Sequence, residues 1–449
     1  MQSAASERSA TQASDPAEDA SGASWQWDEE ADDRAAAPAD VVGGGAGPDG
    51  DGPRPSRRRL LAGAGVLAAG AALWAVSRPS GGGPAPGPPR PLPTRIAGPE
   101  PLWTYRGPAA MTPERLADHP DRPLFLSRTG LQVLDPADGS PLRGLVFETP
   151  GKDRPGDLGT PADRVVLGAD RMFTVSYGHI DGRHLTDAAA DWSLPLPDHL
   201  DGSITLYGSD GATLYGKVSA RPAGGALGGD TLFAVRIADR TVLWSRPVAP
   251  AEQLFTPVTA AGGRLPACDT TAGRTALVVR GAADGERAWS AAADENLRWC
   301  AADQENLYLP DGPAGLRALR LADGSARWET AADPAGELRS LSPVTDGTRV
   351  YLPRDNGLVT AYDAATGAEL WSRRLPFRLD RRSHPLPAGG VLFVPGPAAA
   401  GVCALDAATG TELWTFRDSG PGVDVWSLAA DRTRLYAGHD DILYALPLT

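Results

Sequence analysis

The sequence has little positive charge, and this shortage argues against one class of partner. Lysine occurs only at Lys152 and Lys217, and the 43 basic residues stand against 56 acidic ones, for a formal net charge of −13. A chain this acidic is not expected to bind nucleic acid. The excess of acidic over basic residues is unevenly distributed, because residues 1–56 hold twelve acids and three arginines.

The usual marks of an active site are also missing. No glycine-rich phosphate loop follows a predicted strand, and no serine stands in a GxSxG context. The histidines have neither helical HxxxH spacing nor a cysteine pair beside them, so we predict no zinc site and assign them to the surface. They are His119, His179, His184, His199, His384 and His439. We therefore predict no catalytic residues, no cofactor-binding residues and no metal ligands.

What the sequence does contain is a repeated eleven-residue motif. It is clearest at 361–371 (AYDAATGAELW) and 404–414 (ALDAATGTELW). A strand leads into a turn, in which Asp363 can accept hydrogen bonds from the following backbone and Gly367 can supply a positive φ. The second strand ends on a tryptophan, whose indole offers a large apolar surface for sealing one unit against the next. One such hairpin cannot bury this surface alone, so the repetition predicts several stacked units.

Weaker copies upstream give the period of the repeat. They lie at 318–328, 279–289 and 234–244; a further copy has Arg143 in place of the tryptophan, and the copy ending at Trp192 has lost its turn glycine. The copies end at Trp103, Arg143, Trp192, Trp244, Trp289, Trp328, Trp371 and Trp414, with spacings of 40, 49, 52, 45, 39, 43 and 43. These are the lengths of four-stranded propeller blades.

The two ends of the repeat region complete each other. Residues 443–446 (LYAL) match the first half of the motif and have no second half after them, whereas 101–106 (PLWTYR) resemble 412–417 (ELWTFR) and have no first half before them. We predict that the strand of Leu102–Arg106 pairs with Leu443–Leu446, which closes the ring and removes its open sheet edges. Eight blades result, with seven as the fallback.

The AxDxxTGxxxW pattern of these copies resembles the signature of PQQ-like (pyrroloquinoline-quinone-type) β-propeller repeats, over roughly residues 98–449. The resemblance implies an all-β propeller. Proteins of this kind include quinoprotein dehydrogenases, an eight-bladed outer-membrane-assembly lipoprotein and the extracellular sensor domains of actinobacterial serine/threonine kinases. Since they share a scaffold and differ in chemistry, the function needs a separate argument.

The chain before the repeats divides into three segments. Residues 1–56 are rich in Ala, Ser, Asp, Gly and Pro, which predicts a disordered acidic tail. Residues 57–77 are a twin-arginine-like signal or a membrane anchor, 78–98 are a Pro/Gly linker, and 99–449 are the propeller.

The apolar segment Leu60–Val76 has no charged residue and follows three arginines. The string Ser56-Arg57-Arg58-Arg59-Leu60-Leu61 resembles a twin-arginine export signal, with small residues at 75–77 where a peptidase could cut. The long acidic region before the arginines favours a retained anchor instead, with the tail in the cytoplasm and the propeller outside. A buried helix of a soluble protein is the third alternative.

Two chemical alternatives follow from the resemblance and from the cysteines. A quinone-dependent dehydrogenase needs calcium held by carboxylate and amide oxygens, an aspartate base and, in many relatives, adjacent cysteines; we find none of that set. The recurring Asp-x-x-Thr/Asp-Gly strings resemble calcium loops, but turn geometry alone requires one carboxylate at this position.

Cys268 and Cys300 fall in consecutive blades and either pair outside the cell or stay as free thiols; Cys403 is the third cysteine.

We therefore expect a non-enzymatic extracytoplasmic propeller, held at the cell membrane through residues 60–76, that binds an unknown protein or small molecule on one face as a sensor or scaffold. The alternative is an exported PQQ-dependent oxidoreductase, secreted by the twin-arginine route.

Overall fold

The computed structural model describes most of the chain from Leu92 onward. The described residues are 92–107, 113–117, 123–127, 130–146, 165–168, 170–176, 179–197, 200, 202–219, 229–256, 260–293, 297, 300–311, 315–331, 339–420 and 426–448. The predicted tail, the predicted signal or anchor and most of the predicted linker, residues 1–91, lie outside them. No helix among the described residues is long and apolar enough to span a membrane.

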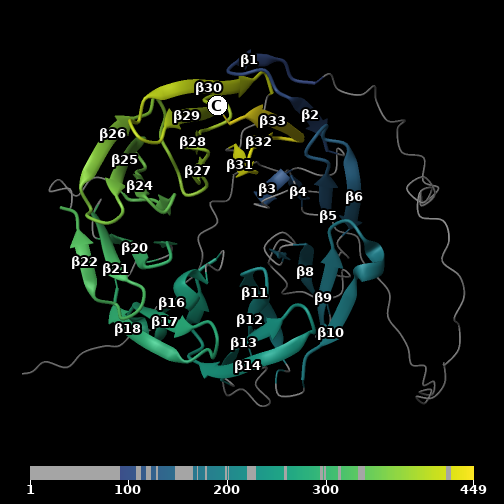
Figure 1. Cartoon of the computed structure of the whole chain (residues 1–449), viewed down its shortest axis with the longest axis vertical. Helices are drawn as coiled ribbons and strands as arrows, with labels where there is room; N and C mark the ends of the chain where they lie inside the picture. The colour runs from purple at the N-terminus through teal and green to yellow at the C-terminus, as the bar shows by residue number, and fades with distance from the viewer. Residues whose placement is uncertain are drawn as a thin grey trace, which may run out of the picture. The chain divides into compact units, whose positions relative to one another are not determined.

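The described strands form eight antiparallel sheets, which are the blades of one ring (Figure 1). In each blade consecutive strands are neighbours, as expected when strands of two to eight residues follow one another in antiparallel order. Figure 1 shows the fourth strand of each blade at the rim of the ring. The all-β, eight-bladed prediction is confirmed.

The first four blades contain β3 to β18. Blade 1 consists of β3 (Pro113–Ala117), β4 (Leu124–Ser127), β5 (Gly130–Leu134) and β6 (Pro141–Val146). Blade 2 consists of β7 (Val166–Leu167), β8 (Arg171–Ser176), β9 (His179–His184) and β10 (Trp192–Pro195). Blade 3 consists of β11 (Ser203–Ser209), β12 (Thr213–Ser219), β13 (Asp230–Arg236) and β14 (Thr241–Val248). Blade 4 consists of β15 (Glu252–Leu254), β16 (Arg264–Asp269), β17 (Ala276–Gly281) and β18 (Arg287–Ala292).

The other four blades contain β19 to β33 and the two N-terminal strands. Blade 5 consists of β19 (Ala301–Ala302), β20 (Asn306–Asp311), β21 (Gly315–Arg320) and β22 (Ala326–Glu329). Blade 6 consists of β23 (Val344–Thr345), β24 (Arg349–Pro353), β25 (Leu358–Asp363) and β26 (Glu369–Arg374). Blade 7 consists of β27 (Leu386–Ala388), β28 (Val391–Pro395), β29 (Val402–Asp406), β30 (Glu412–Asp418) and β1 (Arg95–Ala97). Blade 8 consists of β31 (Ser427–Ala430), β32 (Arg434–His439), β33 (Ile442–Pro447) and β2 (Trp103–Arg106). The 3₁₀ helices η3 (Ala188–Ala190), η5 (Ala261–Gly263) and η6 (Thr271–Gly273) lie in connections.

The ring closes through the strand predicted from the split motif. Strand β2 pairs antiparallel with β33, with Trp103 opposite Ala445 and Arg106 opposite Ile442. The pairing extends past both ends of β2, where Leu102 N donates to Ala445 O at 2.8 Å and Gly107 N donates to Asp441 O at 2.7 Å. The closure prediction is therefore confirmed, and the seven-blade fallback is not needed.

A second N-terminal strand was not foreseen. Strand β1 lies in the segment predicted as linker and adds a fifth strand to blade 7, with Arg95 opposite Asp418. Thr94 and Ser419 extend the pairing through two backbone-donated hydrogen bonds of 2.9 Å. The chain then turns at Gly98 toward blade 8; its φ is +89°, and a Cβ there would lie 2.6 Å from the Cα of Phe416, so glycine is required.

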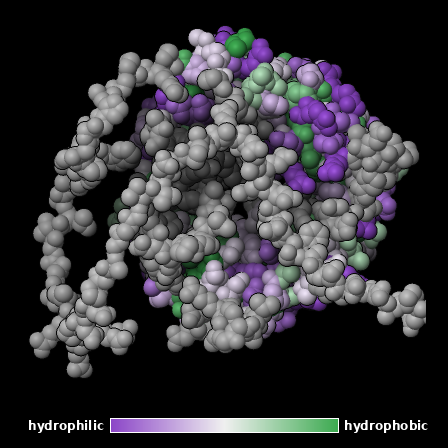
Figure 2. All heavy atoms as spheres, turned by 180° about the vertical axis from the view of Figure 1, so that it is seen from behind, coloured by the Kyte–Doolittle hydropathy of each residue, from purple (hydrophilic) through white to green (hydrophobic). Residues whose placement is uncertain are grey.

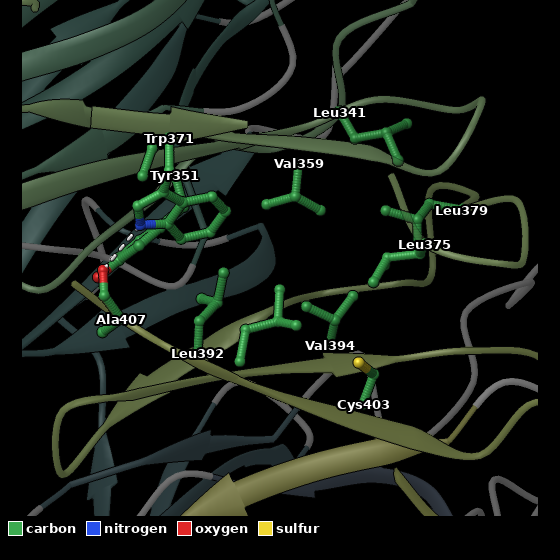
Figure 3. Close-up of a cluster of buried hydrophobic side chains, with 12 residues drawn as sticks. Leu341, Tyr351, Val359, Trp371, Leu375, Leu379, Leu392, Val394, Cys403 and Ala407 are labelled. Atoms are coloured by element: carbon green, nitrogen blue, oxygen red, sulfur yellow. Dashed lines mark hydrogen bonds between the residues drawn. The ribbon is translucent and has the colours of Figure 1, made fainter. Parts of the chain in front are cut away.

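The repeated tryptophans join neighbouring blades through a hydrogen bond and a packing contact, and this pair of contacts is called the indole clasp. Trp371 of blade 6 donates its indole N–H to the carbonyl oxygen of Ala407 in the turn after β29 of blade 7, at 3.0 Å (Figure 3). Its ring covers Gly410 of the same turn, where a Cβ would lie 2.6 Å from the ring. The motif residues therefore act across a blade boundary, which explains why the turn glycine and the tryptophan recur together. The same two contacts join Trp103 to Pro136 and Gly139, Trp244 to Ala282 and Gly285, Trp289 to Leu321 and Gly324, and Trp328 to Ala364 and Gly367.

Hydrophobic clusters between successive blades form the core. In Figure 3, Tyr351 and Val359 of blade 6 face Leu392 and Val394 of blade 7. Each of these four side chains is fully buried. Because each such cluster lies between two blades, no blade is stable without its neighbours, as repeat architecture requires.

One degenerate copy keeps a contact across the blade boundary by other means. Arg143, in place of a tryptophan, donates from its guanidinium to the carbonyl oxygen of His184 in blade 2 and pairs with Asp191 at 2.9 Å. Arg240 stands at the turn-glycine position with a φ of +62°. The sequence predicts these departures to relax the scaffold; at Arg143 the interpretation is wrong, because an ion pair replaces the indole.

Candidate functional site

The two ends of the ring differ in regularity. The end that carries the turns between the first and second strands and between the third and fourth strands is called the turn face. The opposite end, which carries the connections between the second and third strands and between blades, is called the loop face. Residues of the repeated motif build the turn face, whereas the buried charged residues Lys217, Asp230, Asp418 and His439 lie near the loop face.

An aspartate–tyrosine pair recurs on the turn face. The Tyr351 hydroxyl donates to the Asp346 carboxylate at 2.7 Å, and the same ring packs on Trp371 with the centroids 6.0 Å apart. Burial alone would raise the pKa of Asp346, but the hydrogen bonds from Tyr351 and Thr348 outweigh burial and lower it. The pairs are Asp210–Tyr215, Asp303–Tyr308, Asp346–Tyr351 and Asp431–Tyr436. The sequence analysis missed them, although an aspartate five residues before a tyrosine was a readable signal.

These pairs predict that acid weakens the ring. A carboxyl whose pKa is lower in the folded state than its unfolded value of about 3.9 stabilises the fold above that pH, and the contribution is lost as the pH falls through the folded pKa. We expect Asp346→Asn to lower the free energy of unfolding by roughly 1 to 2 kcal/mol at pH 7 and by less at pH 3. Urea unfolding at the two pH values checks this; an equal difference at both would contradict it.

The turn aspartates of the motif have a similar structural role. The Asp363 carboxylate accepts hydrogen bonds from the backbone of Ala365 and Thr366 and from the Thr366 hydroxyl. These bonds lower its pKa. Turn geometry thus accounts for the calcium-loop resemblance, and the described residues contain no group of three or more acidic, histidine or cysteine side chains placed to hold a metal ion.

A buried charged cluster joins blades 3 and 4. Lys217 Nζ lies 2.9 Å from the Asp230 carboxylate and donates to the carbonyl oxygens of Pro250 and Glu252. The Glu252 carboxylate, which is fully buried, accepts two hydrogen bonds from the Arg280 guanidinium, at 2.5 and 2.9 Å. Each charge therefore has an opposite charge beside it, which offsets the cost of burial.

A second buried cluster joins blades 7 and 8. One Asp418 oxygen lies 2.9 Å from His439 Nδ1, and the other accepts the Tyr444 hydroxyl at 2.7 Å. The His439 ring stacks on Trp426, with 4.4 Å between centroids. Burial would raise the pKa of Asp418, but the bonds from His439 and Tyr444 outweigh it and lower that pKa. His439 Nε2 is buried without a hydrogen-bond partner, so the described residues supply an oriented imidazole but no hydroxyl or thiol bonded to it.

The histidine prediction is wrong at one position. His439 is 2 % exposed rather than on the surface, because it lies at the end of β32 on the side facing blade 7, where Asp418 satisfies its Nδ1. His179 and His384 are exposed and His184 is half-buried. His119 and His199 lie outside the described residues.

Cys268, Cys300 and Cys403 form no disulfide in this structure. Cys268 Sγ lies 3.7 Å from the carbonyl oxygen of Leu297, three residues before Cys300. Burial, and then the neighbouring Cys268 thiol, raise the pKa of Cys300. The two side chains are thus neighbours across the boundary of blades 4 and 5, and both alternatives for them stay open.

The eight blades, the indole clasps and the closing strand define a PQQ-like β-propeller. The model of one protein family, described as outer membrane protein assembly factor BamB, matches residues 181–342 and 332–447. These matches cover more than half of the chain, and the protein belongs to this family.

Solved structures share the fold at low sequence identity. The computationally designed Ika8 protein is 12 % identical with a TM-score of 0.58, over 78 % of this chain and 100 % of that one. Quinohemoprotein alcohol dehydrogenase from Comamonas testosteroni is 11 % identical with a TM-score of 0.51, over 78 % of this chain and 76 % of that one. BamB from Moraxella catarrhalis is 14 % identical with a TM-score of 0.42, over 68 % of this chain and 81 % of that one. No curated protein sequence matches the chain.

Proposed function

We propose that the protein is a non-enzymatic, membrane-anchored extracytoplasmic propeller that binds a protein or a small ligand on its loop face. The observation that carries the proposal is the pairing of the buried charges. Lys217 is paired with Asp230 and Glu252 with Arg280, and Asp418 is paired with His439 Nδ1, although His439 Nε2 has no hydrogen-bond partner. A cofactor site needs polar groups held open toward the ligand. These pairs instead stiffen the blades beneath the loops.

The family supports the same reading. Its model is described as an outer membrane protein assembly factor. A rigid ring with variable loops suits such a role, because the scaffold fixes the positions of loops that form the contact surface. We therefore place the binding surface on the loop face, away from the clasped turns.

The rival function is a quinone-dependent oxidoreductase, and one experiment separates the two. We expect the purified protein, given calcium, pyrroloquinoline quinone, a panel of alcohols and sugars and an artificial electron acceptor, to show no turnover above a boiled control. We also expect no rise in melting temperature with calcium and the quinone, because a ligand stabilises only a fold that binds it. Quinone-dependent and calcium-dependent dye reduction would establish the oxidoreductase instead.

The membrane anchor is proposed from the sequence of residues 57–77. We expect deletion of Leu60–Val76 to remove the protein from the membrane fraction of cells. Replacing Arg57 and Arg58 with lysine distinguishes the two export routes: a twin-arginine passenger is strongly impaired, whereas an ordinary anchor inserts almost normally because the positive charge is kept. Full-length protein in the soluble fraction of unmodified cells would contradict the anchor.

A further inference from the structure

Cys268 and Cys300 lie at the boundary between blades 4 and 5, which are side by side at the lower left of Figure 1. Cys268 is the last residue but one of β16, and Cys300 directly precedes β19, so both lie at the loop face. They are 32 positions apart in the sequence and belong to different blades. A bond between their sulfur atoms would therefore join one blade to the next.

The strand register points the Cys268 side chain toward blade 5. The preceding residue, Ala267, belongs to the core cluster shared with blade 3, and successive side chains of a strand point to opposite faces of the sheet. Leu277, directly opposite Cys268 on β17, belongs to the cluster shared with blade 5. Cys300 packs against this same cluster. Both cysteine side chains thus face one interface.

Two further observations place the sulfur atoms close together. Cys268 Sγ lies 3.7 Å from the carbonyl oxygen of Leu297, three residues before Cys300. Burial, and then the nearby Cys268 thiol, raise the pKa of Cys300. The register, this contact and the electrostatic effect agree on the same pair of neighbours.

An oxidant can reach the pair, because both cysteines are partly exposed. On the face that Figure 2 shows, the coloured side chains are mostly hydrophilic, which suits the approach of a small polar molecule. Cys403, in contrast, is 1 % exposed and lies between blades 6 and 7. The three cysteines are therefore expected to differ in their reaction with an oxidant.

The inner strand of blade 5 is the part of the fold that a link at Cys300 would hold. Strand β19 has two residues, and it pairs with β20 only through Ala301 opposite Tyr308 and Ala302 opposite Leu307. So short a pairing gives the strand little stability by itself. A covalent bond at the residue before β19 would fix the start of the strand against blade 4.

We propose that Cys268 and Cys300 form a disulfide in an oxidising compartment, which ties β16 of blade 4 to the start of β19 in blade 5. Disulfides persist in such compartments. The presence of the protein there follows from the export in the proposed function, whereas the pairing of these two thiols follows from the fold.

The oxidant is a small disulfide such as oxidised glutathione. The Cys268 thiolate attacks one sulfur of the oxidant, forms a mixed disulfide and releases the first glutathione thiolate. Because its pKa is raised, Cys300 reacts second: it loses its proton, attacks Cys268 Sγ and displaces the second glutathione thiolate. The two protein thiols lose two electrons, the oxidant is reduced to two thiols, and the two protons end on the glutathione sulfurs.

The test uses the purified full-length protein, folded, incubated with oxidised glutathione and then alkylated in denaturant. Trypsin releases Cys268 in the peptide 265–274 and Cys300 in the peptide 299–317. We expect mass spectrometry of the unreduced digest to show these two peptides linked, with a mass lower by two hydrogen atoms than their sum. Cys403 should carry the alkyl group.

The matched control is Cys403→Ser, which should form the same link, whereas Cys268→Ser and Cys300→Ser should not. Oxidation should raise the melting temperature of the parent and of Cys403→Ser by about 3 to 6 °C, because a closed loop lowers the entropy of the unfolded chain. It should leave the melting temperature of Cys268→Ser unchanged.

The digest of the parent decides the result even where a variant fails to fold. A link that involves Cys403, glutathione retained on Cys268, or three alkylated cysteines after oxidation would each overturn the proposal. Alkylating the thiols in intact cells tests the export separately. A link that forms in the purified protein but is absent from protein alkylated in cells would support the disulfide and contradict the export.

Discussion

A chain that starts at Gly107 is expected to lose the cooperative unfolding transition of the propeller. Removing β2 takes away the fourth strand of blade 8 and leaves the edge of β33 open. It also removes Trp103, which clasps the Pro136–Gly139 turn of blade 1. Calorimetry or urea unfolding should show a broad transition or aggregation in place of one sharp step.

Two controls make this result specific. A chain that starts at Gly87 should unfold like the full-length protein, because all of the described strands lie after this residue. Adding a peptide of residues 98–106 to the shortened chain should restore the sharp transition, since the missing strand can pair with β33 from outside. A shortened chain that unfolds like the parent would show that the ring does not depend on this closure.

Trp371→Ala is expected to destabilise the protein by roughly 3 to 5 kcal/mol, the range for emptying a buried aromatic site. Trp371 is 8 % exposed, packs on Tyr351 within its own blade and fills the space above Gly410 of blade 7. Its indole also donates to the carbonyl of Ala407, which the substitution leaves without this donor. The free energy of unfolding from urea titration measures the effect.

Trp414→Ala is the matched control, with an expected loss of about 1 to 2 kcal/mol. From the sequence alone, the two tryptophans occupy equivalent positions and predict equal losses. In the structure strands β33 and β2 of blade 8 are not joined by a turn, so the half-buried Trp414 lacks the kind of turn on which Trp371 docks. Equal losses for the two variants would contradict the clasp as the source of the difference.

Much of the fold was predictable because the repeat encodes it. The motif spacing predicts the blade count, and its two halves predict the pairing of β2 with β33. Each pattern recurs along the chain, so a copy with altered residues can still be located from the spacing of the other copies. Arg143 shows the limit of this reasoning, since its partner Asp191 lies 48 residues away and belongs to no repeated pattern.

The loop face was less predictable for a physical reason. Asp418, His439 and Trp426 come together only when blades 7 and 8 pack, and no spacing rule links these positions. Strand β1 was hidden in the same way, because its sequence, Arg-Ile-Ala, is too short to show alternation and is preceded by prolines.

Strand β1 also determines how the propeller would bear mechanical load. A force applied to the chain on the N-terminal side of β1 reaches β1 before β2, and β1 is joined to β30 over a short, irregular register at the edge of blade 7. Separating β1 from β30 would lengthen the extended part of the chain while β2 stays paired with β33. The outer strand would thus yield first under tension and protect the strand that closes the ring.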